Sequence, residues 1–317
     1  MSLPDSHPFS FDPTYGYSEA ALLALQPPPE PPGFDAFWQA RSARARAIDP
    51  RPTLAGGRVA GRWTVQDIRF ATTDGITLGG WLLTPREGRL RRGLVVGHGY
   101  GGREAPDLDI PVHDTAILFP CFRGLSRSAA PPVPSEASGH VLHGIEARDR
   151  YVIAGCVEDL WVSVSALLAL FPQIGTGIGY SGISFGGGIG ALALGYEPRI
   201  DRGFLEVPTF GNRPLWLSLP TVGSGDAVQT YAHRDPKVGE RLRIFDAAIA
   251  ARRIDKPMLV APARFDPAVA PPCQFSIANA LPNHENFILD AGHFEYPHEA
   301  EQKAALSRRI ERFFGAS

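Results

Sequence analysis

The chain has 317 residues, of which 44% are hydrophobic and 20% are charged, and its formal net charge at pH 7 is −2. This composition is typical of a globular protein, and the small net charge gives no electrostatic reason to expect nucleic acid or an anionic membrane as a partner. No segment approaches the roughly 18 uninterrupted apolar residues of a membrane-spanning helix. The N-terminus lacks the basic and apolar regions of a signal peptide, and Cys121, Cys156 and Cys273 are too scattered for a disulfide framework or a zinc site. We therefore expect a cytoplasmic protein with reduced thiols and no metal or other cofactor.

Residues 1–33 are predicted to form an extended arm. The run Pro27-Pro-Pro-Glu-Pro-Pro32 excludes regular structure and favours polyproline II. The arm can therefore be disordered, or it can lie across the domain or a neighbouring subunit. Phe34-Asp-Ala-Phe-Trp38 and the Ala/Arg-rich run to Ala47 predict a short amphipathic helix, whose aromatic side chains pin the arm to the body. Residues 34–317 are expected to form a single domain.

Apolar runs along the rest of the chain predict strands that alternate with helices. Alternating apolar residues predict a hairpin over 63–85, with its turn at Asp74-Gly75. The other predicted strands are Leu94–Val96, Thr115–Phe119, Ile178–Gly182, Arg202–Val207, Pro257–Ala261 and Asn286–Leu289. Helices are predicted over 149–171 and 299–314, an irregular loop over 123–143, and a helical insertion over the sheet at 208–250. This order indicates an α/β fold with a mostly parallel central sheet and helices on both faces.

The stretch Gly182-Ile-Ser184-Phe-Gly186 matches the GxSxG pattern of a nucleophile elbow, with a predicted strand before it and a small-residue helix after it. In such a turn the glycines let neighbouring backbone pass close to the serine, and the helix N-terminus faces charge that develops there. The alternative is a glycine-rich connection in a dinucleotide-binding or purely structural βα unit, but no GxGxxG follows the first parallel strand. Cys121 has no elbow and is interpreted as a buried structural thiol rather than a nucleophile.

A serine nucleophile needs a base, and His293 is the predicted base of Ser184. In α/β-hydrolases the base follows the nucleophile and the acid along the chain. His293 lies on a loop after the last predicted strand, at the edge of a parallel sheet where active sites are assembled. His284 is interpreted as a surface residue, and His298 as a residue near the start of the closing helix.

The base in turn needs a carboxylate that fixes its tautomer. Asp266 follows the predicted strand Pro257–Ala261 on a loop at the same edge of the sheet, so we predict that it is the acid. Asp290 is the rival, but it lies only three residues before His293, where a carboxylate more readily braces its own turn.

The oxyanion of the tetrahedral intermediate needs two N–H donors. The N–H of Phe185, directly after the nucleophile, is one expected donor. The N–H of Tyr100, in the glycine-rich loop His98-Gly-Tyr100-Gly-Gly, is the other. Tyr100 and Pro208 are also expected to contact the substrate.

These motifs together resemble the acetyl xylan esterase/cephalosporin C deacetylase family of α/β-hydrolases. The resemblance spans nearly the whole chain. It rests on Phe34-Asp-x-Phe37-Trp38, His98-Gly-Tyr100, Arg123-Gly124, His143-Gly-Ile-x-x-Arg148-Asp149-x-Tyr151, the elbow, Phe265-Asp266-x-x-x-x-Pro271-Pro272 and Gly292-His293. It implies an α/β-hydrolase fold with Ser184, Asp266 and His293 as the triad, Tyr100 and Phe185 as oxyanion donors, and removal of small acyl groups, chiefly acetyl, from sugars and related alcohols. It also implies a homo-oligomer, a hexamer that encloses an inner cavity.

The chain departs from the family pattern at three positions. The family's Arg-Gly-Gln is Arg123-Gly124-Leu125, the glutamine usual after the nucleophile is Phe185, and the family's His-Glu pair is His293-Phe294-Glu295. These changes leave the chemistry intact and bear on the substrate. An α/β-hydrolase that acts on larger esters or amides is therefore an alternative, and a non-catalytic binding homologue is a third possibility, which would need a broken triad.

Overall fold

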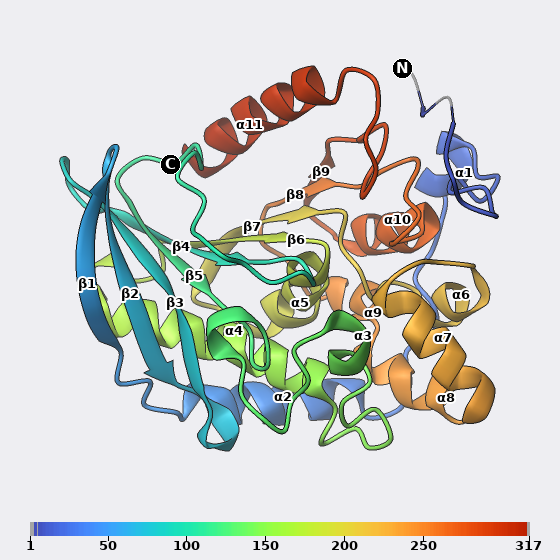
Figure 1. Ribbon diagram of the computed structural model, residues 1–317, viewed down its shortest axis with the longest axis horizontal. Helices are drawn as coiled ribbons and strands as arrows, with labels where there is room; N and C mark the ends of the chain where they lie inside the picture. Colours follow the sequence, from blue (N-terminus) through green and yellow to red (C-terminus); the bar gives the residue numbers. More distant parts are fainter. Residues whose placement is uncertain (1–2, 5, 316–317) are drawn as a thin grey trace.

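The structure is a computed structural model that describes residues 3–4 and 6–315. The described residues form a nine-stranded sheet in the order β1-β2-β3-β5-β4-β6-β7-β8-β9 (Figure 1). The pairs from β1 to β3 and from β3 to β5 are antiparallel, and all pairs from β5 to β9 are parallel. The strands are β1 Thr53–Ala60, β2 Trp63–Ala71, β3 Thr77–Pro85, β4 Arg92–Gly97, β5 Thr115–Pro120, β6 Ile178–Ile183, β7 Ile200–Glu206, β8 Met258–Ala261 and β9 His284–Asn286.

The central strands are buried on both faces, which explains their continuous apolar runs. In β4, Val95 packs into the core on one side of the sheet, whereas Leu94 and Val96 pack into a second core on the other side. The parallel strands all end at one edge of the sheet. The loops that carry the predicted site residues start at this edge.

Helices cover both faces of the sheet, as the sequence predicts. In Figure 1, α2, α4 and α5 lie on one side of the sheet and α11 lies on the other. The helices are α1 Glu19–Leu23, α2 Phe34–Arg46, α3 Ala137–His140, α4 Val152–Leu170, α5 Phe185–Ala193, α6 Arg213–Ser218, α7 Ser224–Arg234, α8 Val238–Leu242, α9 Ala247–Ala251, α10 Pro271–Ala280 and α11 Glu299–Gly315. By length and composition α4 could span a membrane, but 83% of its most apolar window is buried inside this fold.

The segment predicted as a helical insertion contains α6, α7, α8 and α9 and no strand. The first three lie beyond the carboxyl edge of the sheet, beside the short helix α3 (Figure 1). The last differs, because every residue of α9 is buried in the main core. Asp246 caps α9 by accepting the N–H groups of Ala248 and Ile249. The part that stands over the site therefore ends before α9.

Two elements carry no clear signal in the sequence. The edge strand β1 has exposed residues and two glycines with positive φ, so it lacks the alternation that marks a strand, and it forms by pairing with β2. Helix α10 begins with Pro271 and Pro272, a pair that reads as a loop but is compatible with the first turn of a helix. The last strand is also shifted: β9 covers His284–Asn286 rather than 286–289, because Leu289 forms only an isolated bridge with Ala263.

The described part of the N-terminal arm runs along the carboxyl edge of the sheet and contains one helix, α1. Ser18 caps this helix by accepting the N–H of Ala21. The Asn279 side chain of α10 donates hydrogen bonds to the carbonyls of Leu22 and Leu25. These bonds hold the arm against the body of the same chain.

Candidate active site

Ser184 stands in a sharp turn between β6 and α5. Its backbone has φ of 52° and ψ of −110°, a strained conformation for a residue with a side chain. Its N–H donates to the carbonyl of Glu206 at the end of β7, and its carbonyl accepts the N–H groups of Gly188 and Thr209. The surrounding backbone therefore holds the turn on both sides.

The glycines of the elbow are required by close backbone contacts. A Cβ atom on Gly182 would lie 2.5 Å from the carbonyl oxygen of Gly186, and one on Gly186 would lie 2.7 Å from the carbonyl carbon of Gly97. The hydroxyl of Tyr180 also donates to the Gly186 carbonyl, at 2.6 Å. The start of α5 is thus packed directly against the end of β4.

The structure brings Ser184, His293 and Asp266 into one hydrogen-bonded chain. The Ser184 hydroxyl lies 2.9 Å from Nε2 of His293, and Nδ1 of His293 lies 2.7 Å from Oδ2 of Asp266. Because the carboxylate can only accept, Nδ1 carries the proton and Nε2 is free to accept the proton of the serine. This is the arrangement of a nucleophile, a general base and an orienting acid.

Asp266 is fully buried, and its carboxylate has four hydrogen-bond donors. Oδ1 accepts the N–H groups of Ala268 and Val269, both at 2.9 Å. Oδ2 accepts from His293 and from the side chain of Gln274 at 2.8 Å. The carboxylate is therefore held in a fixed orientation. Gln274, which lies on the unpredicted helix α10, was missed by sequence reasoning.

The electrostatics favour a more basic His293. Burial alone lowers the pKa of the imidazole, but the charge of Asp266, the hydrogen bond to it and the charge of Glu206 outweigh burial and raise the pKa. Gly292, before the histidine, has no room for a side chain, because a Cβ there would lie 2.6 Å from Oδ2 of Asp266.

The loop that carries Tyr100 is fixed by His98. Nε2 of His98 accepts the N–H of Phe122 at 3.1 Å, so its proton is on Nδ1, which donates to the Gly99 carbonyl at 2.7 Å. Burial lowers the pKa of His98 to about 4, so the ring stays neutral in this role. Gly99 passes beside Ser184, since a Cβ on Gly99 would lie 3.9 Å from that of the serine.

Tyr100 is held by its ring and by its hydroxyl. The ring stacks on Phe185 with centroids 4.3 Å apart. The hydroxyl donates to Nδ1 of His140 at 3.0 Å, because Nε2 of His140 already donates to the carbonyl of Arg123 at 2.8 Å. Among the described residues, the N–H groups of Tyr100 and Phe185 have no hydrogen-bond acceptor, as expected of donors reserved for an oxyanion.

The Arg123-Gly124 motif supports this loop from the side of the buried helix α4. The Arg123 guanidinium is buried and donates to both oxygens of Asp159, at 3.0 and 2.7 Å. The Arg123 carbonyl accepts from His140, which holds Tyr100. Leu125, where the family pattern has glutamine, is buried in the apolar core.

A cavity of about 370 Å³ opens at the triad. Ser184, His293 and the loop Gly99–Gly101 line it, together with the apolar side chains of Phe210 and Trp216. Tyr100, which the sequence predicts as a substrate contact, lines the cavity. Within the part of the chain that the structure describes, Pro208 does not line the cavity. It packs against Gly187 of α5, and the next two residues, Thr209 and Phe210, line the cavity instead.

The other candidates from the sequence lie away from this chemistry. Asp290 pairs with Arg264 at 2.7 Å, and His298 pairs with Glu301 at 2.8 Å. Nδ1 of His284 donates to the Leu281 carbonyl, and Cys121 is buried with a thiol pKa that burial raises. Within residues 3–4 and 6–315, no cluster of three or more His, Cys, Asp or Glu side chains could hold a metal ion.

The parallel sheet, the strained serine after β6 and the acid and histidine after β8 and β9 define a serine hydrolase with the α/β-hydrolase fold. The family model for acetyl xylan esterase (AXE1) matches residues 26–307. The chain belongs to this family, and it is a carboxylic ester hydrolase. A search of the curated proteins finds no match.

Solved structures of similar fold include two acetyl xylan esterases. The one from Paenibacillus sp. R4 has a TM-score of 0.81 at 21% identity, over 93% of this chain and 99% of that chain. The one from Thermoanaerobacterium sp. JW/SL YS485 has a TM-score of 0.80 at 18% identity, over 95% and 99%. The acylaminoacyl peptidase of Pyrococcus horikoshii is less similar, with a TM-score of 0.60 at 17% identity over 80% of this chain and 41% of that chain.

Proposed function

We propose that the protein removes acetyl groups from acetylated sugars and related small alcohols, through an acetyl-enzyme on Ser184. The observation that carries this proposal is the hydrogen-bonded chain Ser184–His293–Asp266 at the wall of a cavity of about 370 Å³. Small-molecule sites range from about 300 to 1,000 Å³, so this cavity is at the lower end and suits a compact ester.

The geometry accounts for each step of the hydrolysis. Nε2 of His293 takes the proton as Oγ of Ser184 attacks the ester carbonyl, and the N–H groups of Tyr100 and Phe185 bind the resulting oxyanion. His293 then gives the proton to the leaving alkoxide, and the acetyl group stays on Ser184. A water molecule that His293 deprotonates releases acetate and restores the serine.

Phe185 makes the apolar surroundings of this site. Its ring stacks on Tyr100 and packs edge-on against Phe122 and Phe210. The ring therefore fills space behind the nucleophile that a longer acyl chain would need. This packing supports small acyl groups over larger ones.

A chain-length series tests the proposal. With p-nitrophenyl acetate, butyrate and octanoate as substrates, kcat/KM should be highest for acetate and should fall with chain length. Ser184→Ala should abolish hydrolysis of all three. A preference for octanoate would favour the alternative, an α/β-hydrolase of the same mechanism that acts on larger esters or amides, and Ser184→Ala activity at the wild-type level would overturn a serine mechanism altogether.

We also propose that the protein works in the cytoplasm as a homo-oligomer, a hexamer by resemblance to its family, without nucleic acid or membrane as a partner. Cephalosporin C is a second candidate substrate by the same resemblance. Light scattering coupled to size-exclusion chromatography would report the assembly, and a monomer at micromolar concentration would contradict it.

A further inference from the structure

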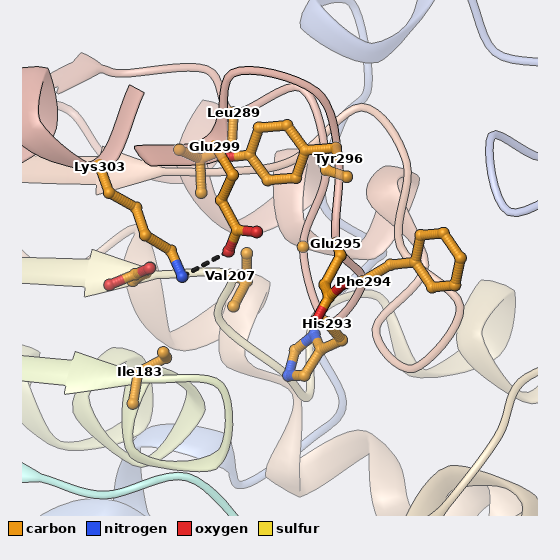
Figure 2. Close-up of a pocket in the computed structure, with 12 residues that line it drawn as sticks. Ile183, Val207, Leu289, His293, Phe294, Glu295, Tyr296, Glu299 and Lys303 are labelled. Atoms are coloured by element: carbon orange, nitrogen blue, oxygen red, sulfur yellow. Dashed lines mark ion pairs between the residues drawn. The ribbon is translucent and has the colours of Figure 1, made fainter. Parts of the chain in front are cut away.

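A second cavity meets His293 on another side. Its volume is about 350 Å³, and it lies between the loop after His293, the ends of β6 and β7, and the start of α11 (Figure 2). Ile183 and His293 line both this cavity and the one that contains Ser184. The two spaces therefore adjoin at the catalytic base.

Charged side chains line this second cavity. Lys303 and Glu299, one turn apart on α11, form an ion pair with a separation of 2.5 Å (Figure 2). Glu206 at the end of β7 and Glu295 after the histidine add two more carboxylates. Three carboxylates thus stand against one ammonium group, so the lining is acidic.

Of these acids, Glu206 is the one whose charge acts on the catalytic histidine. Burial raises the pKa of its carboxyl group, although the charges of Lys303 and His293 act in the opposite direction. Its charge is one of the causes that raise the pKa of His293. The acidic character of the cavity therefore acts on the reaction centre and is not confined to the solvent-exposed rim.

The direction of proton transfer relates this cavity to the reaction. The leaving alkoxide receives its proton from Nε2 of His293, so the alcohol half of the ester must contact that histidine. The carbonyl oxygen of the ester faces the N–H groups of Tyr100 and Phe185. The alcohol half therefore extends away from Tyr100 and past His293, towards the space that Ile183 and His293 share.

We propose that the cavity between His293 and α11 is the subsite for the alcohol half of the ester, and that it selects neutral or cationic alcohols over anionic ones. This proposal rests on the proposed ester hydrolysis. Carboxylates and an ammonium group can hydrogen-bond to hydroxyls, and the ring of Tyr296 on the same lining suits the apolar face of a sugar. Ile183, Glu206 and Lys303 also border a further cavity of about 350 Å³ along α11, which gives room for a longer alcohol.

Two pairs of acetyl esters, matched in shape, test the charge preference. Acetylcholine and 3,3-dimethylbutyl acetate differ in a positive charge, and acetoxyacetate and acetoxyacetamide differ in a negative charge. We expect kcat/KM to be roughly 3- to 10-fold higher for acetylcholine than for its neutral analogue, and lower by a similar factor for acetoxyacetate than for its amide, in line with partly exposed charge pairs.

Variants of α11 supply the matched controls. Glu299→Gln should bring the acetylcholine/3,3-dimethylbutyl acetate ratio and the acetoxyacetamide/acetoxyacetate ratio of kcat/KM closer to one, and Lys303→Met should increase both ratios. Glu301→Gln makes the same charge change as Glu299→Gln on the same helix, but Glu301 pairs with His298 and does not line the cavity, so the ratios should stay at their wild-type values. All four esters give the same acetyl-enzyme, so the rate constant of deacylation, measured from burst kinetics, should be the same for all four.

The outcomes separate the two proposals. Ratios near one in the wild type, or ratios that respond equally to Glu299→Gln and Glu301→Gln, would overturn the subsite while leaving the esterase intact. If none of the four acetates is hydrolysed in a Ser184-dependent way, the proposed function and the subsite fail together.

Discussion

Ser184 and Asp266 follow β6 and β8 at the same edge of the sheet, but different kinds of contact hold them. The serine is held locally, by glycines within four residues of it and by the neighbouring strand ends. The acid depends on segments from distant parts of the chain. Its N–H donates to the carbonyl of Pro13 in the N-terminal arm, and its carboxylate accepts from Gln274 and His293.

The arm makes several contacts on this acid side. Phe9 packs edge-on against Phe294, the residue after the catalytic histidine. The hydroxyl of Tyr15 donates to the carbonyl of Pro220 at 2.7 Å, and Glu19 pairs with Arg264 at 2.6 Å. The comparison indicates that the nucleophile is built into the sheet, whereas the acid and the base are clamped in place from outside it.

The strongest test of the acid side removes the charge of Asp266. Asp266→Asn should reduce kcat by about 10⁴-fold, because the amide no longer fixes the proton on Nδ1 of His293. Asp290→Asn is the matched control and should retain most activity, since Asp290 pairs with Arg264 outside the triad. Steady-state kinetics with p-nitrophenyl acetate would check this, and equal losses in the two variants would contradict the assignment.

On the nucleophile side, Gly182→Ala should break the elbow. The added methyl group would meet the Gly186 carbonyl, and a displacement of about 1 Å at the nucleophile can cost roughly 100-fold in rate. Overpacking of this kind also costs about 1–3 kcal/mol of unfolding free energy. Gly239→Ala, in helix α8 where a Cβ has only an ordinary contact at 3.5 Å, is the control for both measurements. Unchanged activity in Gly182→Ala would show that the turn can accommodate a side chain at position 182, and would contradict the need for glycine there.

Deletion of residues 1–16 isolates the clamp. It removes the acceptor of the Asp266 N–H and the aromatic contact with Phe294, while the sheet and the elbow stay intact. We expect kcat to fall by about 10-fold, since catalytic side chains must be held within about 0.5 Å of their working geometry. Deletion of residues 1–5 removes none of these contacts and should leave kcat unchanged. If the protein without residues 1–16 has the same kcat and the same thermal unfolding midpoint as the full-length protein, the arm does not clamp the acid side.

The smallest expected effect concerns pH. His293 must be neutral to act as a base, and its pKa is raised, so activity should fall as the pH decreases through a value above that of an ordinary histidine. Glu206→Gln removes one cause of the raised pKa and should move this acidic limb of kcat/KM to lower pH. A limb that stays in place, or moves to higher pH, would contradict the contribution of Glu206.

This difference between the two sides also explains how much could be predicted from the sequence. The elbow is a local pattern, so Ser184 and the N–H of Phe185 could be identified from a few adjacent residues. Asp266 and His293 could be found because chain order and strand ends restrict the choice. The positions of most strands and of the two long helices follow from apolar runs, and the structure has them within a few residues of the predicted bounds. The order of the strands in the sheet depends on pairing between distant segments and was not predicted.

The parts that were missed are those created by contacts between distant segments. Gln274 lies on α10, whose two leading prolines conceal a helix. Nothing in the sequence of the arm shows that the Pro13 carbonyl meets Asp266. Pro208 was expected to contact the substrate, but the turn after β7 places Thr209 and Phe210, rather than Pro208, at the wall of the cavity. The acidic cavity beside His293 appears only once α11 is placed against the ends of β6 and β7.

The central claim is that Ser184 is the nucleophile of this triad, and covalent labelling tests it most directly. After incubation with a fluorophosphonate, intact-mass spectrometry should show one adduct per chain, and peptide mapping should place it on Ser184. Labelling should be lost in Ser184→Ala and greatly slowed in Asp266→Asn. An adduct on another residue, or no adduct in a folded protein, would contradict the account.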